Sequence, residues 1–155
     1  MRIRGMAQKK EIISTVNRLL ETLKDGQEGF RQAAEAAKDS ELKSLFNEYS
    51  MERSRFAGEL QDQLRQLGES DPEDSSSVAG SMHRAWINLK GAVTSGDDHA
   101  ILAECERGED SAVSEYKKAM EAEISSPLRE TISRQYERVK SAHDRVRDLR
   151  DARSN

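Results

Sequence analysis

The sequence has few of the features that stabilise small secreted proteins or anchor membrane proteins. Its single cysteine, Cys105, cannot form a disulfide within the chain, which favours a reducing compartment such as the cytoplasm. No apolar run approaches the roughly 18 residues that a membrane-spanning helix needs. The basic N-terminus leads into an amphipathic pattern instead of a secretory signal. We therefore expect a flexible segment at residues 1–7, a cytoplasmic protein and no membrane association.

Aromatic residues and prolines are also rare: aromatic residues make up 5% of the chain, and it contains two prolines. Apolar and charged residues each make up 35% of the sequence, a mixture that is typical of long amphipathic helices. The 25 basic and 29 acidic residues are interspersed and sum to a net charge of −4. Because no basic stripe is present to attract a phosphate backbone, we expect no nucleic-acid partner.

Apolar residues recur every three or four positions in four long segments, which is the spacing of an α-helix that buries one face. The pattern predicts an all-α protein, a single helical bundle domain over residues 8–153. We expect its long helices at about residues 8–38, 40–67, 98–123 and 127–151. Asp39 is a suitable N-cap for the second of them and Gly68 a suitable end, whereas Asp97 or Asp98 suits the start of the third.

The connection at residues 69–96 is long enough to return along the whole bundle. It makes the second and third long helices parallel, so the predicted fold is a ferritin-like four-helix bundle with a long crossover. A short helix is expected in the crossover at about residues 81–94. Its Trp86 is expected to pack in the core, and the alternative is a ligand contact formed by His83, Arg84 and Trp86.

Three of the four helices interrupt their apolar pattern at the same height. If the two hairpins turn where expected, Gly26, Arg53 and Glu109 meet in the middle of the bundle. A buried charge needs a partner, so we expect Arg53 to pair with Glu109, and a glycine at position 26 leaves room for them. Other polar residues flank this predicted buried layer: Asp25, Glu28, Glu52, Glu106 and His143.

The segment "ILAECERGED" places five charges where a helix would bury apolar side chains. Its helical spacing predicts that Glu109 points inward and that Glu106 and Asp110 lie near the boundaries between helices. Glu104 and Arg107 are expected to face water.

A metal site in this layer is the main alternative to an ion pair. A dinuclear iron or manganese centre in such a bundle uses four carboxylates and two histidines. Here Arg55 and Lys140 stand at the spacing of the histidines, and their charges would repel two metal ions. A single metal bound by Glu52, Glu109 and His143 remains open, but we favour a structural polar network.

Catalytic motifs are weak. Cys105 has no histidine at helical spacing, and the serines cluster in the crossover, so we favour a protein without enzymatic activity while leaving the question open.

Five segments carry motifs that are specific as a set: "LKDGQEGFRQAAE", "MERSRFAGELQ", "GSMHRAWINLKGAV", "ILAECERGEDSAVSEYKKAM" and "RQYERVKSAHDRVRDLRD". Together they resemble the bacterial ferritin-like four-helix-bundle family known as domain of unknown function 2383, over residues 10–150. The resemblance implies a ferritin-like fold and a bacterial cytosolic protein. It implies no established activity, and metal binding in that family is inferred from the similarity of the fold.

Three functional hypotheses follow. The first is a ferritin-like protein without enzymatic activity, stress-related by analogy, whose polar layer fixes the register of the helices. The second is a carboxylate-ligated iron or manganese protein acting on oxygen or peroxide. The third is a protein-interaction bundle, with a homodimer as one form of it.

Overall fold

The computed structural model describes residues 2–68, 86, 89–95, 97–124 and 126–153, and this part of the chain is helical without a strand. The all-α prediction is therefore confirmed. The helices are α1 (Arg2–Ala36), α2 (Ser40–Gln66), α4 (Leu89–Ser95), α5 (Asp98–Glu121) and α6 (Ser126–Ala152). None of the described helices is both long and apolar enough to cross a membrane.

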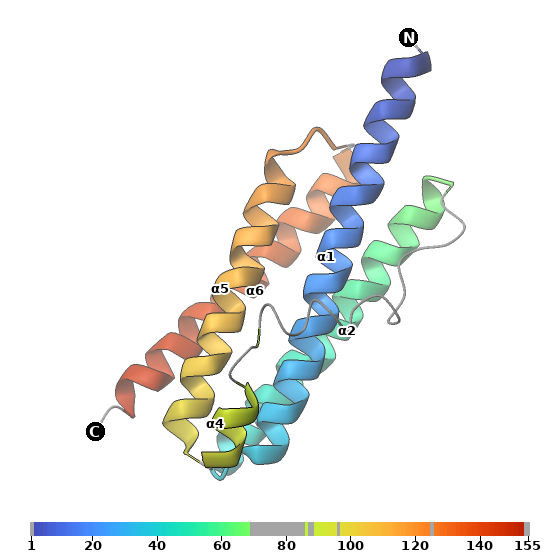
Figure 1. Ribbon diagram of the computed structural model, residues 1–155. Helices are drawn as coiled ribbons and strands as arrows, with labels where there is room; N and C mark the ends of the chain where they lie inside the picture. Colours follow the sequence, from blue (N-terminus) through green and yellow to red (C-terminus); the bar gives the residue numbers. More distant parts are fainter. Residues whose placement is uncertain (1, 69–85, 87–88, 96, 125, 154–155) are drawn as a thin grey trace.

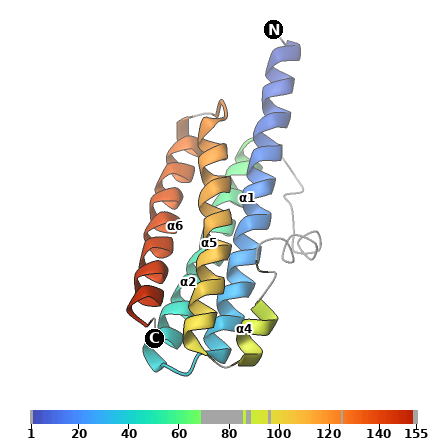
Figure 2. The same cartoon turned by 60° about the vertical axis from the view of Figure 1, so that its left-hand side comes forward.

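The four long helices lie side by side, as Figures 1 and 2 show from two directions. α1 packs antiparallel to α2, and α5 packs antiparallel to α6. α1 also contacts α5, and α2 contacts α6, so the four helices enclose a common interior. α2 and α5 run in the same direction, and the end of α2 and the start of α4 lie toward opposite ends of the molecule.

The helix ends follow the local capping rules. The side chain of Asp39 accepts a hydrogen bond from the backbone N–H of Glu41, and that of Asp97 accepts one from the backbone N–H of His99. Gly68 follows the C-cap residue of α2, Leu67, and has a positive φ of 94°, a conformation that glycine adopts without strain.

Asp98 does not cap its own helix. Its two carboxylate oxygens accept the backbone N–H groups of Lys38 and Asp39, at 2.9 and 3.0 Å. This contact ties the start of α5 to the turn between α1 and α2, although the residues are about 60 positions apart in the sequence. It therefore fixes the relative height of the two hairpins.

Two helix bounds differ from the sequence-based expectation. α1 begins at Arg2 instead of near residue 8, and its N-terminal end projects beyond the other long helices in Figures 1 and 2. Of the short helix expected at 81–94, the described part is α4, which begins at Leu89 and packs against α1 and α5. Residues 81–85 and 87–88 lie outside the described residues.

The buried apolar side chains form two clusters, one at each end of the interior. We call the cluster away from the α1–α2 turn the leucine half; it consists of Val16, Leu19, Leu20, Leu23, Phe56, Ala57, Leu60, Leu64, Ala112, Tyr116, Ala119, Leu128, Ile132 and Val139. We call the other the aromatic half; it consists of Phe30, Ala33, Ala34, Ala37, Leu42, Phe46, Trp86, Ala92, Ile101, Leu102, Cys105 and Val146. Between these halves, buried polar residues interrupt the core.

Candidate functional site

An ion pair occupies the middle of the interior. Arg53 on α2 donates from Nη1 and Nη2 to the two carboxylate oxygens of Glu109 on α5, at 2.6 and 2.8 Å. Each side chain is only 1% exposed. Burial alone would lower the pKa of Arg53, but the charge of Glu109 and its hydrogen bonds raise it, so the guanidinium stays charged. The fork of two parallel hydrogen bonds pairs the two opposite charges directly.

Gly26 on α1 provides the space for this pair. A Cβ atom added to Gly26 would lie 3.3 Å from Nη1 of Arg53 and 3.6 Å from its Cγ. Phe30, one turn further along α1, places its ring 5.4 Å from the guanidinium carbon, a distance at which the ring face attracts a cation. Side chains of α1, α2 and α5 thus meet at the height that the sequence spacing indicates.

Glu52 belongs to the same layer but uses a different partner. It is 5% exposed, and its Oε2 accepts two hydrogen bonds from Arg138 of α6, at 3.0 and 2.8 Å. The side chain of Arg138 is 66% exposed, so this pair joins the interior to the surface. A groove of about 280 Å³ opens here between α2 and α6, and its lining is Glu48, Tyr49, Met51, Glu52, Arg55 and Arg138.

The two acidic residues of α1 that were expected in the layer lie in different environments. Asp25 is buried, at 4% exposure. Glu28 is not in the interior: it bonds Arg31 and Gln32 on its own helix, and the bond from Arg31 is the main reason that its pKa is lowered. Position 28 is two residues beyond Gly26, which turns its side chain about half way round the helix.

The three residues of the alternative metal site, Glu52, Glu109 and His143, do not come together. The carboxylate of Glu109 is turned inward to Arg53, and that of Glu52 is bound by Arg138. His143 on α6 instead directs Nε2 to Asp110, at 2.5 Å. Among the described residues, the side chains that could share a metal ion are Glu106, Asp110 and His143, whose ligand atoms all lie within 4.8 Å of one another.

Glu106 lies at the boundary between α5 and α6. Its side chain is 14% exposed and forms an ion pair with Arg150. Asp110, one turn later, is 63% exposed. Both residues therefore face α6 at the surface and take no part in the ion pair between Arg53 and Glu109.

Glu104 was expected to face water, but the residue is buried, at 4% exposure. Arg107, which is exposed, donates two hydrogen bonds of 3.1 Å to its carboxylate. Glu104 shares a face of α5 with Gly108, one turn later, and Trp86 of the crossover packs against that face at Gly108. The helical spacing alone could not show that a segment from outside the four long helices would pack against this face.

Trp86 lies between α1 and α5, where two glycines make room for its ring. A Cβ atom at Gly29 would approach the ring to 2.6 Å, and one at Gly108 to 2.4 Å, so neither position accepts a side chain without displacing the indole. The ring is 5% exposed and meets Phe30 edge-on, with centroids 5.3 Å apart. Trp86 is thus a core residue, as favoured, and His83 and Arg84 of the alternative ligand contact lie outside the described residues.

The sequence-based expectations did not include a second buried polar contact, which lies in the leucine half. The hydroxyl of Tyr116 donates to Oε1 of Gln135 at 2.6 Å, and Nε2 of Gln135 donates to the backbone carbonyl of Phe56 and to Glu59. Burial raises the pKa of Tyr116, which keeps its hydroxyl protonated. The signal in the sequence was a glutamine at an interior position of the last helix.

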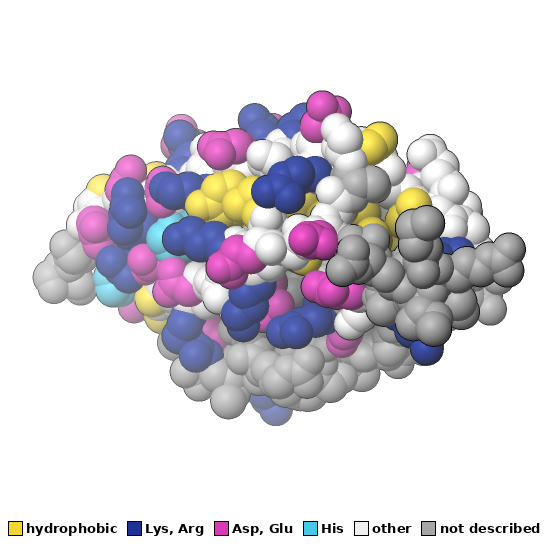
Figure 3. All heavy atoms as spheres, turned by 90° about the horizontal axis from the view of Figure 1, so that it is seen from above, with side chains coloured by type: hydrophobic (Ala, Val, Ile, Leu, Met, Phe, Trp, Pro, Cys, Tyr) yellow, Lys and Arg dark blue, Asp and Glu magenta, His cyan; other side chains and the backbone are white. Residues whose placement is uncertain are grey.

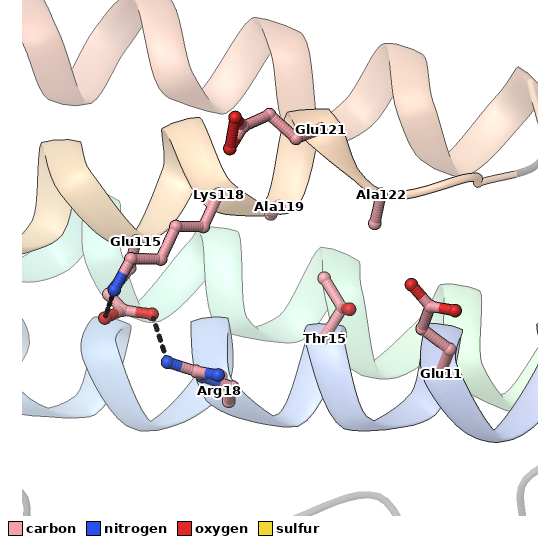
Figure 4. A pocket seen from close by; sticks show the side chains of 8 residues that line it. All are labelled: Glu11, Thr15, Arg18, Glu115, Lys118, Ala119, Glu121 and Ala122. Carbon is pink, nitrogen blue, oxygen red and sulfur yellow. Dashed lines mark ion pairs between the residues drawn. The ribbon is translucent and has the colours of Figure 1, made fainter.

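Another groove, of about 270 Å³, lies between α1 and α5 away from the central layer (Figure 4). Its charged side chains largely neutralise one another: Glu115 pairs with Arg18 at 3.4 Å and with Lys118 at 3.6 Å. Glu11 and Glu121 also line this groove. The face of the molecule in Figure 3 has the same character, with acidic and basic side chains interspersed around a small hydrophobic area.

Comparison with known protein families places most of the chain in one of them. The family described as "domain of unknown function (DUF2383)" matches residues 11–122. None of the curated proteins is a significant match to the chain. The matched range contains Gly26, Arg53 and Glu109, as well as both glycines that hold Trp86, whereas α6 lies beyond it. The chain therefore belongs to the family of domain of unknown function 2383.

Proposed function

We propose that this protein is a ferritin-like four-helix bundle without enzymatic activity in its interior, from a bacterial cytoplasm. The observation that carries the proposal is the bidentate pair of Arg53 and Glu109 at mid-height. In ferritin-like metalloenzymes the same level of the bundle holds two metal ions between glutamates and histidines. Here a permanently charged guanidinium occupies that level and uses both oxygens of the central glutamate.

The chemistry of arginine supports this assignment. A guanidinium cannot lose its proton in a protein, so it offers no lone pair to a metal and repels one by its charge. Releasing Glu109 to a metal ion would leave Arg53 charged and unpaired, with 1% of its side chain exposed. Such a loss costs several kcal/mol, about 3–5 by comparison with other buried pairs.

In this proposal the ion pair has a structural role. It joins α2 to α5, which come from different hairpins, and both hydrogen bonds form only when the hairpins stand at one relative height. The contact of Asp98 with the α1–α2 turn specifies the same register from the end of the molecule. The pair fixes the height at the centre, and any ligand or partner is left to the surface.

Metal analysis of protein purified without chelators tests the proposal. We expect iron and manganese well below one ion per chain, with the same content in Glu52→Ala and Glu109→Ala variants. Stoichiometric iron or manganese that is lost in both variants would establish the metalloenzyme alternative instead. His99→Ala serves as the matched control, because it removes a histidine at the start of α5 and leaves every carboxylate of the interior in place.

A further inference from the structure

The boundary between α5 and α6 carries three side chains of the kinds that bind transition metals. Glu106 and Asp110 are one turn apart on the same face of α5, and His143 faces them from α6. Nε2 of His143 lies 2.5 Å from Oδ1 of Asp110 and 4.0 Å from Oε2 of Glu106. This cluster is separate from the interior pair, since the carboxylate of Glu109 points to Arg53.

We propose that Glu106, Asp110 and His143 form a surface binding site for a divalent transition-metal ion of the zinc class. Zinc binds histidine nitrogen and carboxylate oxygen at about 2.0–2.2 Å, which places tetrahedral ligand atoms about 3.3–3.6 Å apart. Relative to the observed distances, Asp110 has to move slightly away from His143 and Glu106 slightly toward it. Both shifts are within about 1 Å, which side-chain rotation on a helix surface supplies.

A fourth residue orients the histidine as in known zinc sites. Nδ1 of His143 lies 3.0 Å from Oδ1 of Asp144, and Asp144 is itself held by Lys140 at 3.0 Å. When Nδ1 donates its proton to a carboxylate, Nε2 presents its lone pair to the metal. In this structure Nε2 is the atom directed at Asp110 and Glu106. The geometry thus contains the ligands and the group that sets their orientation.

In this proposal, water supplies the remaining ligand of the metal ion. The side chains of Glu106 and His143 are 14% and 16% exposed, whereas that of Asp110 is 63% exposed. A metal ion would therefore be held from the protein side, and water would reach it from the side of Asp110. Three protein ligands with an open position are the arrangement in which zinc keeps exchangeable water.

Arg150 would compete with the metal ion for the carboxylate of Glu106. It forms an ion pair with Oε1 of Glu106, while Oε2 is the oxygen nearer to His143. Arg150 also donates to Asp151 at 2.8 Å, so a second carboxylate is available to it. The positive charge beside Glu106 weakens metal binding, and removing that charge should strengthen it.

The ligand set also selects among metals. One imidazole with two carboxylates suits borderline ions such as zinc and cobalt(II), whereas magnesium and calcium prefer oxygen ligands alone. Two carboxylates and a neutral imidazole balance a charge of +2. We therefore expect zinc to bind with one ion per chain and more tightly than magnesium.

Calorimetric titration of the untagged full chain with zinc tests the site. We expect His143→Ala to weaken zinc binding at least about 10-fold and Asp144→Asn to weaken it about 10-fold, as for other groups that orient a metal-bound histidine. Arg150→Gln should tighten it several-fold. Equal zinc affinity in the wild type and in His143→Ala would overturn the proposal, and an unchanged affinity in Arg150→Gln would remove Glu106 from the ligand set.

His99→Ala is the matched control, because it removes a described histidine from the start of α5 and should leave zinc affinity unchanged. Circular dichroism of each variant establishes that the helices remain. The Glu52→Gln variant distinguishes this surface site from a metal site in the interior. Zinc binding that falls in Glu52→Gln but not in His143→Ala would place the metal in the interior and overturn the surface site.

Discussion

The two halves of the interior are built differently. Among the described residues, the buried side chains of the leucine half all come from the four long helices, and leucine is its most frequent residue. The aromatic half has alanines along α1, and its volume is filled by Phe30, Phe46 and Trp86. Trp86 comes from the crossover, so this half is completed by a segment outside the four long helices.

Two glycines account for the difference. Gly29 of α1 and Gly108 of α5 both border the Trp86 ring, and the absence of two side chains creates a slot for it. In the leucine half, Leu20, Leu23 and their neighbours fill the space between the helices directly. Periodic leucines can therefore be paired from the sequence, whereas a slot made of glycines needs a partner from elsewhere in the chain.

The largest expected effect lies at the boundary between the halves. Glu109→Ala should lower the free energy of unfolding by about 3–5 kcal/mol, because it leaves the Arg53 guanidinium buried without its partner. Urea denaturation followed by circular dichroism measures this loss. A double variant, Arg53→Met with Glu109→Leu, should recover most of the stability, since no buried charge remains. A loss below about 0.5 kcal/mol for Glu109→Ala would contradict the buried pair.

Next in size is the slot of the aromatic half. Gly108→Ala should lower the free energy of unfolding by about 1–3 kcal/mol, because its Cβ would lie 2.4 Å from the Trp86 ring. In a Trp86→Ala background the same substitution should become neutral or stabilising, since the clash is gone. Gly58→Ala, whose Cβ would meet nothing within 4 Å, is the control and should gain about 0.5–1 kcal/mol. Equal effects at positions 108 and 58 would exclude the slot.

A smaller effect is expected at Gly26. A Cβ atom there would lie 3.3 Å from the Arg53 guanidinium, which its two bonds to Glu109 hold in place. The gain in helix propensity from alanine offsets part of this strain, so Gly26→Ala should cost less than about 1 kcal/mol. The same denaturation measurement would show a gain as large as that of Gly58→Ala if the contact with Arg53 were unimportant.

The smallest effect concerns the edge of the aromatic half at high pH. Burial raises the pKa of Tyr49 to about 12 from its ordinary value of 10. A folded-state pKa above the unfolded one means that its contribution to stability is complete below pH 10 and is lost as the pH rises toward 12. Tyr49→Phe should therefore reduce the fall in unfolding free energy between pH 9 and pH 11.5. An identical fall in both proteins would place the Tyr49 hydroxyl in water.

The polar residues of the long helices differ in how well the sequence indicated their positions. Gly26, Arg53 and Glu109 interrupt regular apolar patterns, and the lengths of the hairpins set their heights, so spacing alone indicated that they would meet. Glu104 and Glu28 were misplaced for opposite reasons. Glu104 lies one turn before Gly108, where Trp86 of the crossover packs, and the rotation of α1 carries Glu28 to the surface, where Arg31 binds it.

The sequence by itself determined the all-α class, the positions of the four long helices and the charges that interrupt their apolar faces, because helical periodicity and capping depend on residues a few positions apart. Only the tertiary structure decided that Trp86 would enter the slot between Gly29 and Gly108, that Asp98 would bind the α1–α2 turn, and that His143 would face Asp110. These contacts join distant parts of the chain. Their geometry depends on how the helices rotate and approach one another, which periodicity within one helix does not specify.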